Sequence, residues 1–101
     1  MPFTKVASRT DFMGRSIKKV DVDGRSIMII RLGEEYHALD ATCTHEDADL
    51  SRGILMGRTI VCPLHLSRFS VDTGEVENPP ATENLQKYEL KVEGDDILVE
   101  L

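Results

Sequence analysis

The chain lacks the features that stabilise a small secreted protein or anchor a protein in a membrane. It contains no tryptophan and only two cysteines in 101 residues, and one pair of cysteines cannot staple a small secreted scaffold. Its longest apolar run, residues 27–30, has four residues, whereas a membrane-spanning helix needs about 20. The first residues carry no apolar signal segment. We therefore expect a soluble protein in the reducing setting of the cytoplasm, without a membrane segment.

The chain also lacks an excess of basic residues. Its 12 Lys and Arg are outnumbered by 18 Asp and Glu, which gives a net charge of −6. This charge argues against attraction to nucleic acid or to anionic membranes and favours a protein partner with a basic surface. Glu46, Asp47 and Asp49 cluster just after His45 and are candidates for a docking surface, although acidic residues also serve simply to solvate loops.

No segment of ten or more residues has a helical period, so we expect one all-β domain over residues 1–101. Asp23-Gly24 is typical of a tight hairpin turn, and the turn at Gly33-Glu34 adds a third strand to predict a meander. Two irregular segments begin at Ala41 and at Cys62. Strands are expected at residues 3–7, 16–22, 25–32, 35–40, 54–61, 68–71, 75–76, 85–92 and 97–101.

A histidine follows each cysteine closely, in Cys43-Thr44-His45 and in Cys62-Pro63-Leu64-His65. Three randomly placed histidines would produce this arrangement on the order of once in a hundred chains, so the spacing is a signal. Thiolate is a soft donor and imidazole a borderline one, and both suit zinc or an iron–sulfur cluster. Two such loops can hold a four-ligand site, and the spacing leaves a tetrahedral zinc and a [2Fe-2S] cluster both open.

The residues around these two motifs resemble the Rieske ferredoxin family. The matching segments follow the family's order along the chain and span nearly all of it; they are Phe3 to Val6, Tyr36 to Asp40, Cys43 to His45, Leu50 to Gly53, Cys62 to His65, Phe69, Asp72 to Gly74 and Asn78 to Ala81. The resemblance implies a Rieske-like antiparallel β-sandwich. It also implies a small inserted cluster-binding subdomain at about residues 41–81.

The resemblance implies one [2Fe-2S] cluster and assigns its four ligands. Cys43 and Cys62 would bind one iron, and His45 and His65 would bind the other. Two neutral imidazoles in place of thiolates leave the site less negative, which makes it easier to add an electron than in a four-cysteine ferredoxin. His37 is then the only histidine left over, and we expect it to be an ordinary strand residue.

Departures from the family pattern predict a low reduction potential. Ala48 and Leu64 stand where the Rieske proteins of respiratory complexes carry a disulfide between the two loops. Ser67 matches a hydroxyl that donates to the cluster in those proteins, whereas Phe69 stands in the place of a tyrosine and has no hydroxyl. One hydrogen bond that raises the potential is therefore expected to be absent, as in the subclass that serves oxygenases.

Two further residues are expected to cover the cluster. Leu66 replaces a glycine that usually follows the second ligand histidine, and an apolar cover at this position lowers the potential because it disfavours the more highly charged reduced state. Pro80 lies in the proline stretch that closes over the cluster in the family, although a rigid turn is the simpler interpretation.

The resemblance implies a one-electron carrier that is not itself an enzyme and has no catalytic residue. Its electrons would come from an NAD(P)H-dependent flavoprotein ferredoxin reductase and go to a terminal oxygenase, commonly one that hydroxylates aromatic rings. An oxygenase would need a second iron site with two histidines, and one spare histidine excludes it from this chain. We expect a monomer. The alternatives are a zinc-stabilised Cys2His2 interaction module and a Rieske ferredoxin with a redox partner other than an oxygenase.

Overall fold

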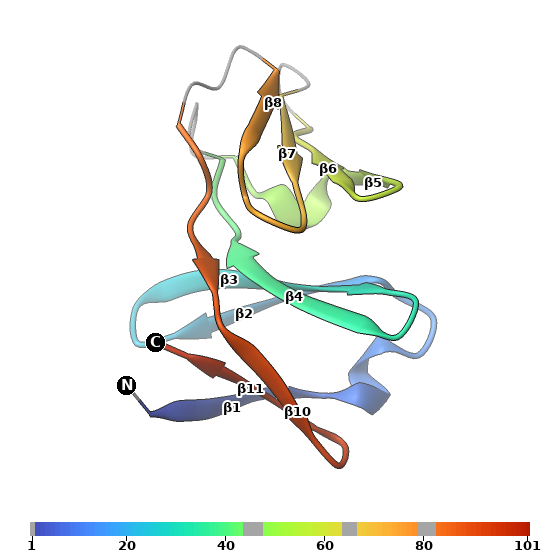
Figure 1. Cartoon of the computed structure of the whole chain (residues 1–101), viewed down its shortest axis with the longest axis vertical. Coiled ribbons are helices and arrows are strands. Elements are labelled where there is room, and N and C mark those ends of the chain that lie inside the picture. Colours follow the sequence, from blue (N-terminus) through green and yellow to red (C-terminus); the bar gives the residue numbers. More distant parts are fainter. Residues whose placement is uncertain (1, 44–47, 64–66, 79–82) are drawn as a thin grey trace.

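The computed structural model describes residues 2–43, 48–63, 67–78 and 83–101, and these residues form antiparallel sheets without an α-helix (Figure 1). Two short 3-10 turns, η1 (Arg9–Phe12) and η2 (Leu50–Arg52), interrupt the strands. No helix in these ranges is long and apolar enough to cross a membrane. The Cα radius of gyration is 12.7 Å, close to the value of about 13 Å for a single 100-residue domain. The predicted all-β class is confirmed.

Two sheets form the base of the molecule. The first has the order β1-β11-β10 and the second the order β2-β3-β4-β9. Their strands are β1 (Phe3–Ser8), β2 (Ile17–Val22), β3 (Arg25–Leu32), β4 (Glu35–Asp40), β9 (Lys87–Tyr88), β10 (Leu90–Glu93) and β11 (Asp96–Glu100).

A third, smaller sheet lies beside the open face of the second one, above the base in Figure 1. Its order is β5-β6-β7-β8, and its strands are β5 (Ile54–Met56), β6 (Thr59–Val61), β7 (Arg68–Ser70) and β8 (Val76–Asn78). Leu55, Ile60, Phe69 and Val76 share one face of this sheet by strand pairing, and all four belong to or pack on one hydrophobic cluster. The opposite face of this sheet points away from that cluster.

β3 is buried on both of its faces because it separates two hydrophobic clusters. Ile27 and Ile29 point into the cluster between the two base sheets, whereas Met28 and Ile30 point into the cluster below the small sheet. All four side chains have no exposed surface. The longest apolar run of the sequence, residues 27–30, therefore lies between the two cores and contributes side chains to both, as expected of a strand covered on two sides.

The pairing confirms the predicted meander and corrects two strand boundaries. Asp23 and Gly24 form the β2–β3 turn with φ of 50° and 79°, as a type I′ hairpin requires. The expected strand at 54–61 is a hairpin of two strands that turns at Gly57. The expected strand at 85–92 is divided at Glu89, because β9 pairs with β4 and β10 pairs with β11. Local sequence cannot show that one strand changes sheet.

Gly74 holds the turn between β7 and β8 against the segment before β9. The Leu85 N–H donates to the Gly74 carbonyl at 2.7 Å, and a Cβ atom on Gly74 would clash with the Leu85 carbonyl oxygen. Gly74 also has a φ of +80°, which strains any residue with a Cβ. Gly57 has a similar φ of +62° but open space around it.

We predict that Gly74→Ala lowers the melting temperature far more than Gly57→Ala. The positive φ alone costs about 1 kcal/mol and lowers Tm by about 5 °C in a domain of this size. The clash at Gly74 adds an overpacking penalty, for a total of about 3 kcal/mol and about 15 °C. Thermal unfolding followed by circular dichroism checks this, and equal shifts for the two variants would contradict it.

Candidate metal centre

Cys43 and Cys62 begin two loops that are closed in the same way. The Cys43 N–H donates to the Ala48 carbonyl at 2.9 Å, and the Cys62 N–H donates to the Ser67 carbonyl at 2.7 Å. The residues that flank each of these bonds are also paired. Thr42 forms an antiparallel β-bridge with Asp49, and Val61 pairs with Arg68 between β6 and β7. Each cysteine therefore stands at the start of a segment whose two ends, 43 with 48 or 62 with 67, are joined by a backbone hydrogen bond.

Both cysteines are buried in the same hydrophobic cluster and are not joined in a disulfide. Cys43 is 3% exposed and Cys62 is 1% exposed. Two buried thiols in an apolar surrounding form a donor set that suits a soft metal centre. The structure thus brings the two predicted cysteine ligands into one core from segments 19 positions apart.

The two predicted histidine ligands, His45 and His65, lie outside the described residues, and so do Leu66 and Pro80. Of the other residues predicted around the cluster, Ser67 and Phe69 are described, and neither has exposed surface. Ser67 closes the second loop through its carbonyl, while the Phe69 ring is part of the core below the small sheet.

His37 lies on β4 among charged side chains. Its Nδ1 is 3.2 Å from the Lys87 ammonium, which can only donate, and its Nε2 is 3.1 Å from the Glu35 carboxylate. A neutral ring with its proton on Nε2 satisfies both contacts. Since both ring nitrogens have partners on the base, His37 is the strand residue that the sequence predicted.

Asp49 uses its carboxylate within its own segment. Its Oδ1 accepts from the Ser51 N–H at 3.0 Å and from the Ser51 hydroxyl at 2.5 Å, and its Oδ2 is 3.6 Å from the Lys19 ammonium. Burial alone would raise the pKa of this carboxyl, but the Ser51 bonds and Lys19 outweigh it and hold the pKa below its ordinary value. Of the three acidic residues considered for docking, Asp49 is thus an N-cap of η2, and Glu46 and Asp47 lie outside the described residues.

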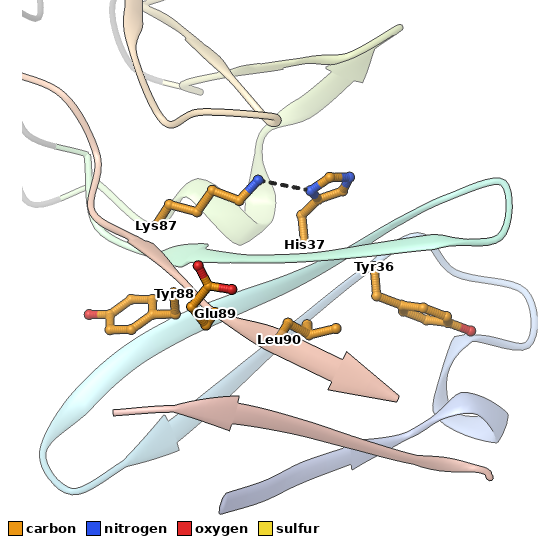
Figure 2. Close-up of a pocket in the computed structure, with 6 residues that line it drawn as sticks. All are labelled: Tyr36, His37, Lys87, Tyr88, Glu89 and Leu90. Carbon is orange, nitrogen blue, oxygen red and sulfur yellow. Dashed lines mark hydrogen bonds between the residues drawn. The ribbon is translucent and has the colours of Figure 1, made fainter. Parts of the chain in front are cut away.

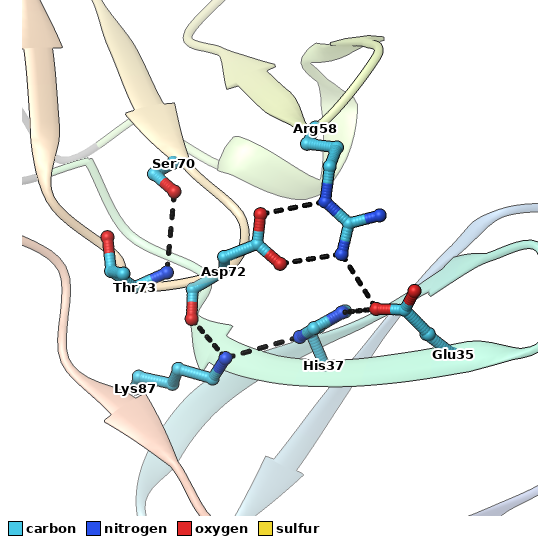
Figure 3. A network of polar contacts seen from close by, with 7 residues as sticks. All are labelled: Glu35, His37, Arg58, Ser70, Asp72, Thr73 and Lys87. Atoms are coloured by element: carbon cyan, nitrogen blue, oxygen red, sulfur yellow. Dashed lines mark hydrogen bonds and ion pairs between the residues drawn. The ribbon is translucent and has the colours of Figure 1, made fainter.

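A polar network that sequence reasoning missed joins the small sheet to the base (Figure 3). The Arg58 guanidinium, in the β5–β6 turn, donates to both Asp72 oxygens at 2.8 and 2.6 Å and to Glu35 at 2.7 Å. The Lys87 ammonium donates to the Asp72 carbonyl. Arg58 thereby lowers the pKa of both the Glu35 and the Asp72 carboxyl. The bonds to Arg58 span 14 and 23 positions, so no local pattern predicts them.

The same network does not resemble a metal site. Glu35, His37 and Asp72 offer ligand atoms within 4.8 Å of one another. However, Arg58 and Lys87 bring two positive charges to the same atoms and satisfy their hydrogen bonds. A cation would have to displace both, so these groups act as an ion-pair network.

A cleft of about 360 Å³ opens on the base (Figure 2). Its lining residues are Tyr36, His37, Lys87, Tyr88, Glu89 and Leu90, from β4 and from the strand that changes sheet. Neither cysteine lines it. The cleft therefore belongs to the side of the base that carries the polar network, and the candidate metal centre lies elsewhere in the fold.

Comparison with known protein families gives one match that covers most of the chain. The family model described as "Rieske [2Fe-2S] domain" matches residues 3–89. The ferredoxin component of a naphthalene 1,2-dioxygenase system from Pseudomonas aeruginosa is 40% identical over 82 residues, which are 81% of this chain and 79% of that one.

Solved structures of similar proteins share the whole fold. The ferredoxin of carbazole 1,9a-dioxygenase from Nocardioides aromaticivorans is 32% identical, with a TM-score of 0.91 over 98% of this chain and 97% of that one. A ferredoxin solved in a complex with its oxygenase, also of carbazole 1,9a-dioxygenase, is 34% identical. Its TM-score is 0.88 over 96% of this chain and 91% of that one.

We predict that the contribution of Arg58 to stability disappears in acid. The pKa values of Glu35 and Asp72 are lowered in the folded state from ordinary values of 4.5 and 3.8. Their stabilising effect is therefore complete above those ordinary values and is lost as the pH falls through the lower folded values. The difference in Tm between wild type and Arg58→Gln should be largest near neutral pH and shrink below about pH 4.

The control is Arg9→Gln, since Arg9 forms no ion pair with any described carboxylate. Its Tm difference from wild type should be small at every pH. If the difference in Tm between wild type and Arg58→Gln stays constant from pH 7 to pH 3, the ion pairs of Arg58 with Glu35 and Asp72 do not contribute to stability as predicted.

Proposed function

Because the chain belongs to the Rieske [2Fe-2S] family, we propose that it carries single electrons from an NAD(P)H-dependent flavoprotein reductase to a terminal oxygenase that hydroxylates aromatic rings. As a ferredoxin it holds one [2Fe-2S] cluster, and it is an electron carrier rather than a catalytic enzyme. The observation that carries the proposal is the pair of equivalent loops, each closed by a hydrogen bond from the N–H of a buried cysteine.

We assign the cluster ligands to Cys43 and Cys62 on one iron and to His45 and His65 on the other. The cluster supplies one-electron redox chemistry when it is bound. The described residues support this role because the two cysteines are shielded from water by the apolar core that contains Met28, Ile30 and Phe69. A protein that excludes water around the sulfur donors keeps the centre in a low dielectric and so tunes its potential.

The relatives support the choice of acceptor. Their names identify them as components of naphthalene and carbazole dioxygenase systems, and one of them was solved together with its oxygenase. By this likeness, the acceptor of our chain is an oxygenase of the same class. The reductase is proposed because an electron carrier without catalytic groups needs an enzyme to load it. We place the protein in the cytoplasm as a monomer.

We further propose that residues 1–101 are a single Rieske domain in which about 41–81 form the cluster-binding subdomain. The small sheet β5-β6-β7-β8 falls within that range and, among the described residues, forms no ladder with either base sheet. Both cysteine loops lie in the same range, which suits a unit that presents the cluster at one end of the molecule.

Electron paramagnetic resonance of the dithionite-reduced protein tests the cluster and its ligands. We expect a coloured protein with the signal of a reduced Rieske centre, which is lost in His45→Ala and in His65→Ala. His37→Ala is the matched control and should keep the signal, since His37 is held by Glu35 and Lys87. A colourless protein that contains zinc would instead identify the interaction module.

We predict that Phe69→Tyr raises the reduction potential. Phe69 has no exposed surface and belongs to the same hydrophobic cluster as Cys43 and Cys62, so a phenol there places a hydroxyl in the core that contains both thiols. A hydrogen bond to the cluster or its thiolates favours the more negative reduced state. A difference of about 1 kcal/mol between redox states corresponds to about 40 mV for one electron. Redox titration measures the shift, and an unchanged potential with an intact cluster would contradict the prediction.

A further inference from the structure

Gly53 lies between the segment that is paired with Cys43 and the small sheet that carries Cys62. It follows η2 directly, and its N–H donates to the Leu50 carbonyl at 2.9 Å. The next residue, Ile54, begins β5 and pairs with Val61, the last residue of β6. Gly53 therefore belongs to the connection between the two cysteine segments.

The backbone conformation does not require a glycine at this position. Gly53 has a φ of −74° and a ψ of −174°, which is extended backbone that any residue adopts. The other six glycines of the chain have φ values between 62° and 83°, and each of them stands in the region that favours glycine. The need for a glycine at position 53 is therefore one of space.

The space beside Gly53 is filled by backbone atoms. A Cβ atom at this position would clash with the Val61 carbonyl oxygen and would lie 3.2 Å from the Val61 carbonyl carbon and 3.1 Å from the Leu50 carbonyl oxygen. Backbone atoms cannot turn away as the end of a flexible side chain can. A methyl group at position 53 would therefore have to shift the main chain of one segment or the other.

The clashing carbonyl belongs to the peptide group that carries the Cys62 N–H. A peptide group is planar, so a shift of the Val61 carbonyl also moves that N–H. The Cys62 N–H donates to the Ser67 carbonyl at 2.7 Å. Displacing the Val61–Cys62 peptide would therefore disturb the bond that joins the two ends of the second cysteine segment.

The other side of the contact leads to Cys43. Leu50, whose carbonyl would face the added methyl group, has no exposed surface. Its N–H donates to the Ala41 carbonyl at 2.7 Å, two positions before Cys43. Because Leu50 and both cysteines pack in one hydrophobic cluster, a close-packed core leaves little room to absorb the shift.

From this contact we propose that Gly53 is a positioning residue of the metal centre. The absence of a side chain lets the η2 segment pack against the Val61–Cys62 peptide, which fixes Cys62 relative to the segment that contains Cys43. The inference rests on the proposed function, in which these two thiolates bind the same iron. A small displacement of one thiolate then changes the coordination of that iron. Gly53 acts through the peptide and not as a ligand.

The variant Gly53→Ala tests this assignment, with Gly74→Ala and Gly57→Ala as controls. Gly74→Ala also drives a Cβ atom into a backbone carbonyl, that of Leu85, but Leu85 is not adjacent to a cysteine. Gly57→Ala alters the β5–β6 hairpin of the same sheet, where the added atom meets open space. The holoproteins are compared by paramagnetic resonance of the dithionite-reduced cluster, by circular dichroism and by the rate at which a chelator removes iron.

We expect the g values of Gly53→Ala to differ from those of wild type, whereas both controls keep the wild-type values. Loss of stability alone does not move g values, so Gly74→Ala should keep them although its Tm falls. Gly53→Ala should also lose iron about tenfold faster than Gly57→Ala, which corresponds to the lower end of the usual cost of overpacking. A Gly53→Ala protein that is folded but holds no cluster is a stronger form of the same result.

Wild-type g values in Gly53→Ala would overturn the positioning role and leave the proposed function standing. The same g-value shift in Gly74→Ala would overturn it too, because the shift would then follow from any strain in the core. If Gly53→Ala is unfolded where Gly74→Ala is folded, the contact serves the whole fold and the assignment is also overturned. Wild-type protein without the signal of a reduced Rieske centre would overturn the proposed function, and the role of Gly53 with it.

Discussion

The burial of β3 on both faces is the constraint on which the rest of the structure depends. Ile27 and Ile29 close the core of the base, while Met28 and Ile30 form the floor of the core that contains Cys43 and Cys62. One strand thus couples the stability of the scaffold to the surroundings of the cysteines. A polar substitution at Met28 or Ile30 would leave an unsatisfied group in a fully apolar site, whereas the alternating strands around it tolerate polar residues on one face.

The two cysteine loops depend on this floor and on the small sheet above it. Each loop is a local motif closed by one backbone hydrogen bond, but neither can bury its thiol alone. Burial requires Leu55, Ile60 and Phe69 from the small sheet to meet β3 across the core. The Arg58 network also connects the small sheet to the base. Its hydrogen bonds join the β5–β6 and β7–β8 turns to Glu35 on β4. Apolar packing and ion pairing therefore hold the two layers together at different places.

The net charge of the chain does not by itself identify a docking face. Two acidic side chains of the described residues are engaged within the chain, Asp49 with Ser51 and Lys19, and Asp72 with Arg58. The distribution of paired and unpaired charges follows from contacts between segments far apart in the sequence, so composition and net charge cannot reveal it.

The sequence alone determined the all-β class and the β2–β3–β4 meander, and it predicted the two cysteine ligands, which the structure buries in one core. Those features depend on local patterns: turn residues at Asp23-Gly24, alternating apolar residues, and a cysteine and histidine within four positions of each other. Only the tertiary structure decided that one strand divides at Glu89 between two sheets and that β3 is shared by two cores. It also decided that Arg58 bonds to Glu35 and that Val61 pairs with Ile54 on one side and with Arg68 on the other. These outcomes are pairings between distant segments, whose free energy depends on which surfaces meet, and no local pattern encodes that choice.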